Sequence, residues 1–176
     1  MTARNVGSDE GRDSEIPEWE RLGRGASGHD VSDEEPEILR ELLTFVLNDA
    51  PYAVPVDQVR EIIRLREITP MPRVPDSVVG VVALRGEVVQ VLDGRMRLGL
   101  ALSPPTRRSR IIVLHGEDNG VTGVLVDAVD QVLRVSEDKI SPANSSQRGA
   151  VVEFCKRGDE FVSIVDMAHV LDLDAS

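Results

Sequence analysis

An internal repeat is the feature of this sequence that most constrains its fold. Residues 56–65 align with residues 126–135 at an offset of 70, and every apolar position of the first segment is apolar in the second. A later match, at an offset of 73, joins residues 89–93 to residues 162–166. Such self-similarity is typical of a duplicated structural unit. We therefore expect two related units, at about 42–102 and 108–174.

Short runs rich in Val, Ile and Leu recur from residue 37 onward, separated by Pro, Gly, Asp and Asn. Runs of this kind are typical of strands in sandwiches and barrels. Five strands are enough to close a small barrel that its own side chains fill. The sequence therefore predicts an all-β fold of two packed five-stranded barrels, and it leaves open whether the barrels are intertwined. The ten predicted strands are Leu42–Leu47, Tyr52–Val56, Arg60–Leu65, Val78–Leu84, Val88–Leu92, Arg110–Leu114, Val121–Val126, Gln131–Val135, Ala150–Cys155 and Glu160–Val165.

Two short helices are predicted, and each begins at an aspartate that the repeat places in an equivalent position. They cover Asp93–Leu98 and Asp166–Leu171. An aspartate at the start of a helix can accept hydrogen bonds from the free backbone N–H groups of the first turn. We therefore interpret both aspartates as helix caps.

The first 36 residues differ in composition from the rest of the chain. They contain ten acidic residues and four arginines, and their apolar residues show no sustained period. A segment of this kind buries too little apolar surface to offset the entropy lost on ordering. We therefore predict a disordered acidic tail over 1–36, followed by one folded region over 37–176.

The formal net charge of −11 disfavours two classes of partner. Nucleic-acid backbones and anionic membrane surfaces both attract Lys and Arg, not an excess of acid. The sequence also contains no apolar run of the roughly 18–20 residues that cross a bilayer. The single cysteine, Cys155, cannot form an internal disulfide, and its apolar strand predicts a buried, inert thiol. We expect a cytoplasmic protein that neither binds nucleic acid nor inserts into a membrane.

Catalytic and metal-binding groups are sparse. Asp166 and His169 have the spacing of two metal ligands on a helix, but no third ligand is visible, and Met96 occupies the position equivalent to His169. We therefore predict no metal, no cofactor and no enzymatic activity. One alternative of another class is a small hydrolase that uses Asp93 and Asp166, although neither is followed by the Thr-Gly or Ser-Gly of two-lobed aspartic enzymes.

Arg85 is the polar residue that stands out most. It follows an apolar strand and precedes Gly86, which suits a turn. A guanidinium offers several hydrogen-bond donors in a fixed fork. Arg85 could therefore tie down a loop, contact a partner, or do both.

Six stretches of the chain form a recognisable combination of motifs. They are Tyr52-Ala53-Val54-Pro55-Val56, Val59-Arg60-Glu61-Ile62, Ile68-Thr69-Pro70-Met71-Pro72, Val79-Gly80-Val81-Val82-Ala83-Leu84-Arg85-Gly86, Val91-Leu92-Asp93 and Gly123-Val124-Leu125-Val126-Asp127. Together they resemble the CheW family of chemotaxis adaptors over about Glu37 to Leu173. The resemblance implies two SH3-like barrels and a non-catalytic role. It also implies two partners, the regulatory domain of a CheA-type histidine kinase and the cytoplasmic tip of a methyl-accepting chemoreceptor.

The same resemblance assigns receptor-binding roles to seven residues on the two sides of a groove between the barrels. Two departures concern receptor choice: Ala83 replaces the family's usual Asn, and Gln90 to Gly94 replaces its Pro-x-x-Asp-Leu. A coupling protein of another chemosensory pathway, controlling pili, gliding or development, is a second reading with the same chemistry. The seven residues are Val59, Glu61, Gly80, Arg85, Val126, Val129 and Val132. Because Glu61 lies two residues after Val59, we expect the two side chains to share one face of a strand.

Overall fold

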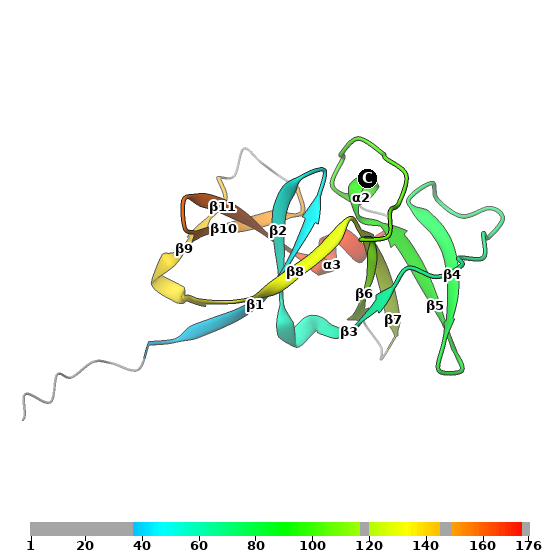
Figure 1. The fold of residues 1–176 in the computed structure, drawn as a ribbon, viewed down its shortest axis with the longest axis horizontal. Helices are drawn as coiled ribbons and strands as arrows, with labels where there is room; N and C mark the ends of the chain where they lie inside the picture. The colour runs from blue at the N-terminus through cyan, green and yellow to red at the C-terminus, as the bar shows by residue number, and fades with distance from the viewer. Residues whose placement is uncertain (1–36, 117–119, 145–148, 174–176) are drawn as a thin grey trace, which may run out of the picture. The chain divides into compact units, whose positions relative to one another are not determined.

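The computed structural model describes residues 37–116, 120–144 and 149–173, so the predicted tail lies outside the described residues. The described chain is mostly β-strand with a few very short helices, which confirms the all-β prediction (Figure 1). The strands are β1 (Leu39–Leu47), β2 (Ala50–Pro55), β3 (Val59–Arg64), β4 (Val78–Leu84), β5 (Glu87–Asp93), β6 (Arg110–His115), β7 (Val121–Val126), β8 (Ala128–Ser136), β9 (Ile140–Pro142), β10 (Val151–Arg157) and β11 (Glu160–Val165). The helices are α2 (Gly94–Arg97) and α3 (Met167–Leu171), with 3-10 turns η1 (Val56–Gln58) and η3 (Glu137–Lys139).

The strands form two sheets, and each sheet contains strands of both repeats. The six-stranded sheet has the order β8-β1-β2-β11-β10-β9, and the five-stranded sheet has the order β3-β6-β7-β5-β4. The β1–β2 hairpin of the first repeat therefore lies among strands of the second, and the β6–β7 hairpin lies among strands of the first. Figure 1 shows the six-stranded sheet on the left and the five-stranded sheet on the right. The two repeats have exchanged their first hairpins.

The pairing registers confirm the internal duplication. In the six-stranded sheet, the parallel strands β2 and β11 align Tyr52 with Ser163. In the five-stranded sheet, the parallel strands β5 and β7 align Gln90 with Thr122. These positions are related by the offsets of 70 and 73 seen in the sequence. The sixth strand, β9, is too short to have been predicted, and its counterpart is the isolated bridge between Thr69 and Val81.

The Arg-Gly pairs of the two repeats, Arg85-Gly86 and Arg157-Gly158, do not occupy equivalent positions. Matching the two Arg-Gly pairs places Arg85 opposite Arg157, at an offset of 72. The hairpin registers instead pair Leu84 with Glu87 and Arg157 with Glu160, so that Arg157 corresponds to Leu84. The offset of 73 therefore holds through both hairpins, and Arg85 corresponds to Gly158.

Three hydrophobic clusters fill the described fold. One lies within the five-stranded sheet and includes Ile63, Val91 and Val113. Another lies within the six-stranded sheet and includes Leu42 and Cys155. The third, which we call the inter-sheet core, draws on both sheets and on α3. Its buried members are Leu43, Phe45, Leu47, Tyr52, Val54, Ile112, Leu114, Val124, Val126, Ala150, Val165, Met167 and Val170.

Both predicted helix caps are confirmed. The carboxylate of Asp93 accepts hydrogen bonds from the backbone N–H groups of Arg95 and Met96 at the start of α2. The carboxylate of Asp166 accepts one from Ala168 at the start of α3. Within the described residues, neither these helices nor any other is long and apolar enough to cross a membrane.

Candidate functional site

Three of the seven candidate residues face the inter-sheet core. Val126, at the end of β7, is 1% exposed and belongs to this core. Val59, at the start of β3, and Val129, in β8, pack against it as partly buried residues. Val59 and Val129 are repeat equivalents, so the two repeats bring matching valines to the same cluster. Substitution of these valines would therefore act first on packing between the sheets.

Val59 and Glu61 do not share a face, so that expectation was wrong. The pairing of β3 with β6 shifts between them, because Val59 lies opposite Leu114 and Glu61 lies opposite the adjacent residue, Val113. Leu114 belongs to the inter-sheet core and Val113 to the core of the five-stranded sheet. A bulge places one extra residue in β3, and this turns Glu61 to the other side of the strand.

Glu61 and Arg85 come together at the turn of the β4–β5 hairpin. Arg85 has a φ of +50° and Gly86 a φ of +84°. Positive φ at both central residues is characteristic of a type I′ hairpin turn. From this turn the Arg85 guanidinium reaches the Glu61 carboxylate at 3.2 Å, with side-chain exposures of 74% for Arg85 and 18% for Glu61. The pair thus presents an exposed cation above a largely covered carboxylate.

Two further contacts join the same hairpin to β3. The guanidinium of Arg60 lies 2.8 Å from the carboxylate of Glu87. The guanidinium of Arg66, just after β3, donates to the backbone oxygen of Ala83. Since β3 and β4 are the two edge strands of the five-stranded sheet, these contacts help to close it. Sequence reasoning did not single out Arg60 and Glu87, and the repeat does not conserve the charge of Arg60. The equivalent residues Asp130 and Glu160 both pair with Arg157.

Gly80 has a packing role as well as a predicted binding role. Its φ is +149°, and a Cβ atom there would lie 2.3 Å from the backbone oxygen of Thr69. Thr69 and Val81 exchange two backbone hydrogen bonds of 2.9 Å. Only a glycine lets the segment before β4 approach the strand this closely.

Val132 lies in the other sheet, away from the hairpin that carries Arg85. It is 51% exposed on the edge strand β8, and its repeat equivalent Ile62, on the edge strand β3, is 41% exposed. Sequence reasoning did not single out Ile62, although the repeat makes it the residue equivalent to Val132. The structure therefore brings Glu61 and Arg85 into contact and divides the other candidates between the inter-sheet core, a tight backbone approach and a second sheet edge.

Buried polar side chains of the described region are held by structural contacts, although the buried Nε atom of Arg95 has no hydrogen-bond partner. Arg95 is 3% exposed and forms an ion pair with Asp127, while one of its nitrogens donates to the backbone oxygen of Ser103 at 2.7 Å. Burial raises the pKa of the Cys155 thiol and of the Tyr52 hydroxyl. Hydrogen bonds to Glu160 and Asp130 raise the pKa of the Arg157 guanidinium. These groups act in packing and in ion pairs.

Several proteins similar to this chain carry the name CheW. The sequence model of the CheW-like domain matches residues 41–175. Chemotaxis protein CheW of Rhizobium meliloti is 43% identical over 103 residues, which cover 58% of this chain and 66% of that protein. Chemotaxis protein CheW of Helicobacter pylori is 26% identical over 159 residues, or 89% of this chain and 94% of that protein.

Two further similarities bear on the breadth of the family and on the fold. Protein FrzA of Myxococcus xanthus is 33% identical over 110 residues, which cover 58% of this chain and 64% of that protein. The crystal structure of the scaffolding protein TtCheW from Thermoanaerobacter tengcongensis superposes with a TM-score of 0.73 at 24% identity, covering 79% of this chain and 97% of that one. The match over 41–175 spans nearly all of the described region, and the chain therefore belongs to the CheW-like domain family.

Proposed function

We propose that this protein is a non-catalytic adaptor that couples chemoreceptors to a CheA-type histidine kinase. The observation that carries the proposal is the CheW-like match over residues 41–175, supported by relatives named chemotaxis protein CheW. The carboxylates of Asp93 and Asp166, which the hydrolase reading would use, are engaged as helix caps. A scaffolding role agrees with a chain in which the buried polar groups of the described region serve packing.

The receptor tip would contact the exposed candidates of the site. Arg85 is the most exposed of them, and Glu61 fixes its guanidinium at the hairpin turn. An amphipathic helix can bind by laying an apolar face in a groove while polar groups at the rim fix its register. Arg85 would supply such a rim contact. The kinase's regulatory domain would bind a separate surface, and the protein would act in the cytoplasm at receptor arrays.

The first experiment is a pull-down of this protein with the cytoplasmic domains of the cell's chemoreceptors and with its histidine kinases. Retention of one receptor and one kinase on the same protein supports coupling. A protein that retains neither partner, or that hydrolyses a substrate in an Asp93- and Asp166-dependent way, contradicts the proposal.

Three variants separate an interface role of Arg85 from a structural one. Arg85→Ala removes the cation, and Arg85→Lys keeps the charge but loses the fork. Arg85→Asn suits the positive φ of the turn better than arginine does. We expect each to weaken receptor binding, by about tenfold or 1.4 kcal/mol for Arg85→Ala, with kinase binding and melting temperature retained.

Arg134→Ala is the matched control. Arg134 also forms an exposed ion pair, with Glu41 in the six-stranded sheet. The Arg134→Ala substitution should leave receptor binding unchanged. Equal losses of receptor and kinase binding in the Arg85 variants, together with a lower melting temperature, would assign Arg85 a structural role alone.

A second candidate is coupling in a pathway that controls pili, gliding or development. The similarity to Protein FrzA favours it, because that relative carries a name other than CheW. The chemistry of the site would be the same, and the identity of the retained receptor and kinase would distinguish the two.

A further inference from the structure

Two arginines face each other across the paired strands β3 and β6. Arg64, the last residue of β3, is the direct cross-strand partner of Arg110, the first residue of β6. Like charges in directly opposite positions repel and destabilise a sheet.

The internal repeat shows what the same position holds in the other sheet. Arg64 corresponds to Arg134, which lies opposite Glu41 in the pairing of β1 with β8. Arg134 and Glu41 form an ion pair of 2.7 Å. The duplicated unit therefore neutralises this position in one sheet, whereas in the other Arg110 replaces the acid.

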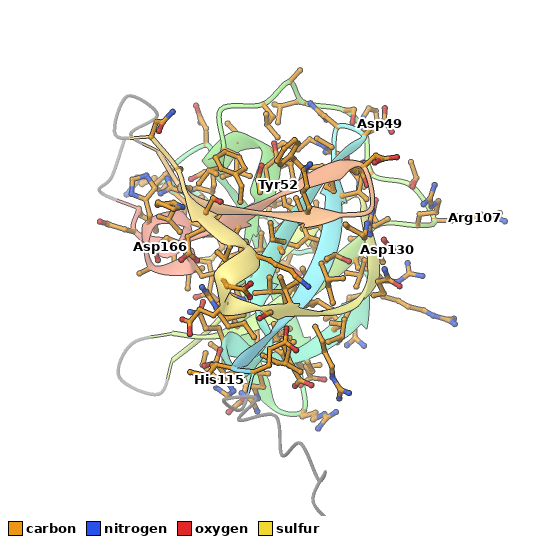
Figure 2. All side chains as sticks on the ribbon, turned by 90° about the vertical axis from the view of Figure 1, so that its left-hand side faces the viewer. Asp49, Tyr52, Arg107, His115, Asp130 and Asp166 are labelled. Carbon is orange, nitrogen blue, oxygen red and sulfur yellow. The ribbon has the colours of Figure 1, made fainter. Side chains whose placement is uncertain are left out.

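Arg64 and Arg110 line an open cleft of about 650 Å³. We call it the arginine cleft, and its residues are Arg64, Leu65, Pro105, Thr106, Arg107 and Arg110. One guanidinium nitrogen of Arg110 donates to the backbone oxygens of residues 107, 108 and 109, which holds the adjoining loop in place. Arg107 extends from that loop away from the ribbon (Figure 2).

No carboxylate among the described residues neutralises this cluster. Arg64, Arg107 and Arg110 form none of the ion pairs seen within 37–116, 120–144 and 149–173, whereas arginines such as Arg40 and Arg60 do. The cleft has no acidic residue in its lining. Three arginines thus line one hollow of a protein whose net charge is −11.

The chemistry of the cleft selects its ligand class. Guanidinium groups bind carboxylates in a planar, two-bonded geometry. The loop offers a phosphate few free backbone donors, because the N–H groups of Thr106 and Arg108 already bond to the hydroxyls of Ser109 and Thr106. Leu65 and Pro105 add apolar surface suited to a peptide.

We propose that the arginine cleft binds a carboxylate-rich segment of a protein partner. This site is separate from the receptor-binding candidates, since it contains none of them. Its failure would therefore leave the proposed coupling function untouched, and the reverse is also true.

The test is an NMR titration of the full-length, isotope-labelled protein with a capped hexaglutamate peptide at about 50 mM salt, where screening is weak. We expect amide shifts confined to residues 63–66 and 104–110, and none with hexaglutamine. Arg64→Gln and Arg107→Gln should each lower the association constant at least about threefold, as expected for exposed ion pairs. Arg134→Gln, at the equivalent position, should not.

Arg110→Glu gives an independent readout. It places a carboxylate opposite Arg64, as Glu41 lies opposite Arg134, and it also removes the hydrogen bonds from Arg110 to the loop. We therefore expect this charge reversal to abolish hexaglutamate binding, a larger effect than that of either neutral variant. Binding that survives both Arg107→Gln and Arg110→Glu overturns the proposal. So does a hexaglutamate titration that moves no amide in the two segments.

Three other occupants are distinguished by parallel arms. Inorganic phosphate and vesicles containing anionic lipid are titrated in place of the peptide. Shifts of the same amides with either, but not with hexaglutamate, would overturn the assignment to protein carboxylates. A full-length variant with the acidic residues of 1–36 changed to amides tests the chain's own acids. If these tail substitutions shift the NMR signals of the cleft amides before any peptide is added, the chain's own tail occupies the cleft, and the assignment to a partner is overturned.

Discussion

Arg85 occupies a backbone conformation that most residues avoid. Its φ of +50° lies in the region favoured by Gly, Asn and Asp, and other residues lose roughly 1–2 kcal/mol there. An exposed ion pair such as that with Glu61 contributes only about 0.2–1 kcal/mol to the free energy of unfolding. Turn stability therefore does not explain an arginine at this position. The proposed receptor contact would explain it, because the guanidinium lies beside Glu61 with its side chain 74% exposed.

Gly80 and Gly86 provide a matched pair of glycine substitutions. Both have positive φ, but a Cβ at Gly80 would meet the backbone of Thr69 at 2.3 Å, whereas nothing lies within 4 Å of one at Gly86. We expect Gly86→Ala to lower the free energy of unfolding by about 1–2 kcal/mol through backbone strain alone. Gly80→Ala should lower it further, since the segment around Thr69 must move. Urea denaturation measures both, and equal losses would contradict the close approach.

Cys155 is expected to be chemically inert in the folded protein. It is 2% exposed, and burial raises the pKa of its thiol, which keeps it protonated. Ellman's reagent should react with it only at the rate of unfolding, and quickly in denaturant. Because burial raises the pKa of the folded thiol, the protonated thiol contributes to the free energy of unfolding. That contribution is fully present below the thiol's ordinary pKa and is lost as the pH rises above it. Cys155→Ser, which titrates in neither state, should flatten stability in that alkaline range, and rapid native labelling would contradict the burial.

At the scale of elements, the repeat made β3 and β8 predictable because their apolar positions match residue by residue. The three-residue β9, which ends in a proline, carries no periodic pattern. The bulge that separates Val59 from Glu61 depends on pairing with β6, which local sequence does not encode. The arrangement of the candidate site likewise depends on contacts that local sequence does not encode. Motifs identified Glu61 and Arg85, but their contact arises from the meeting of two edge elements.

The two helix caps should be separable in strength. Asp93→Ala and Asp166→Ala should each cost about 0.5–2 kcal/mol, the usual range for a lost cap. We expect the larger loss at Asp93, which accepts two backbone N–H groups and lies 4.0 Å from the buried Arg95. Chemical denaturation gives the values, with the exposed loop variant Asp76→Ala as control. Asp93→Asn should recover part of the cap, and partner binding should survive all four changes.

At the scale of the whole molecule, the exchange of hairpins makes the two sheets interdependent. The inter-sheet core contains residues of the exchanged hairpins, such as Phe45 and Leu114, together with α3. Neither sheet can lose its central strands without removing part of this core. We therefore expect residues 37–176 to unfold in one cooperative transition.

Removal of residues 1–34 should leave that transition nearly unchanged. The tail is rich in acid and poor in apolar residues, so it has little to contribute to a core. Calorimetry of the full chain and of the truncated chain should give melting temperatures within about 4 °C, or about 1 kcal/mol for a domain of this size. A larger fall would show that the tail stabilises the fold.

The exchanged hairpins also determine what happens if the chain is divided. A cut in the segment between α2 and β6 would leave β1–β5 on one fragment and β6–β11 on the other. Each fragment would then carry the hairpin that the other needs at the centre of its sheet. The halves of the duplication are thus obligate complements, and a split form of this protein would regain its fold only where both fragments are made together.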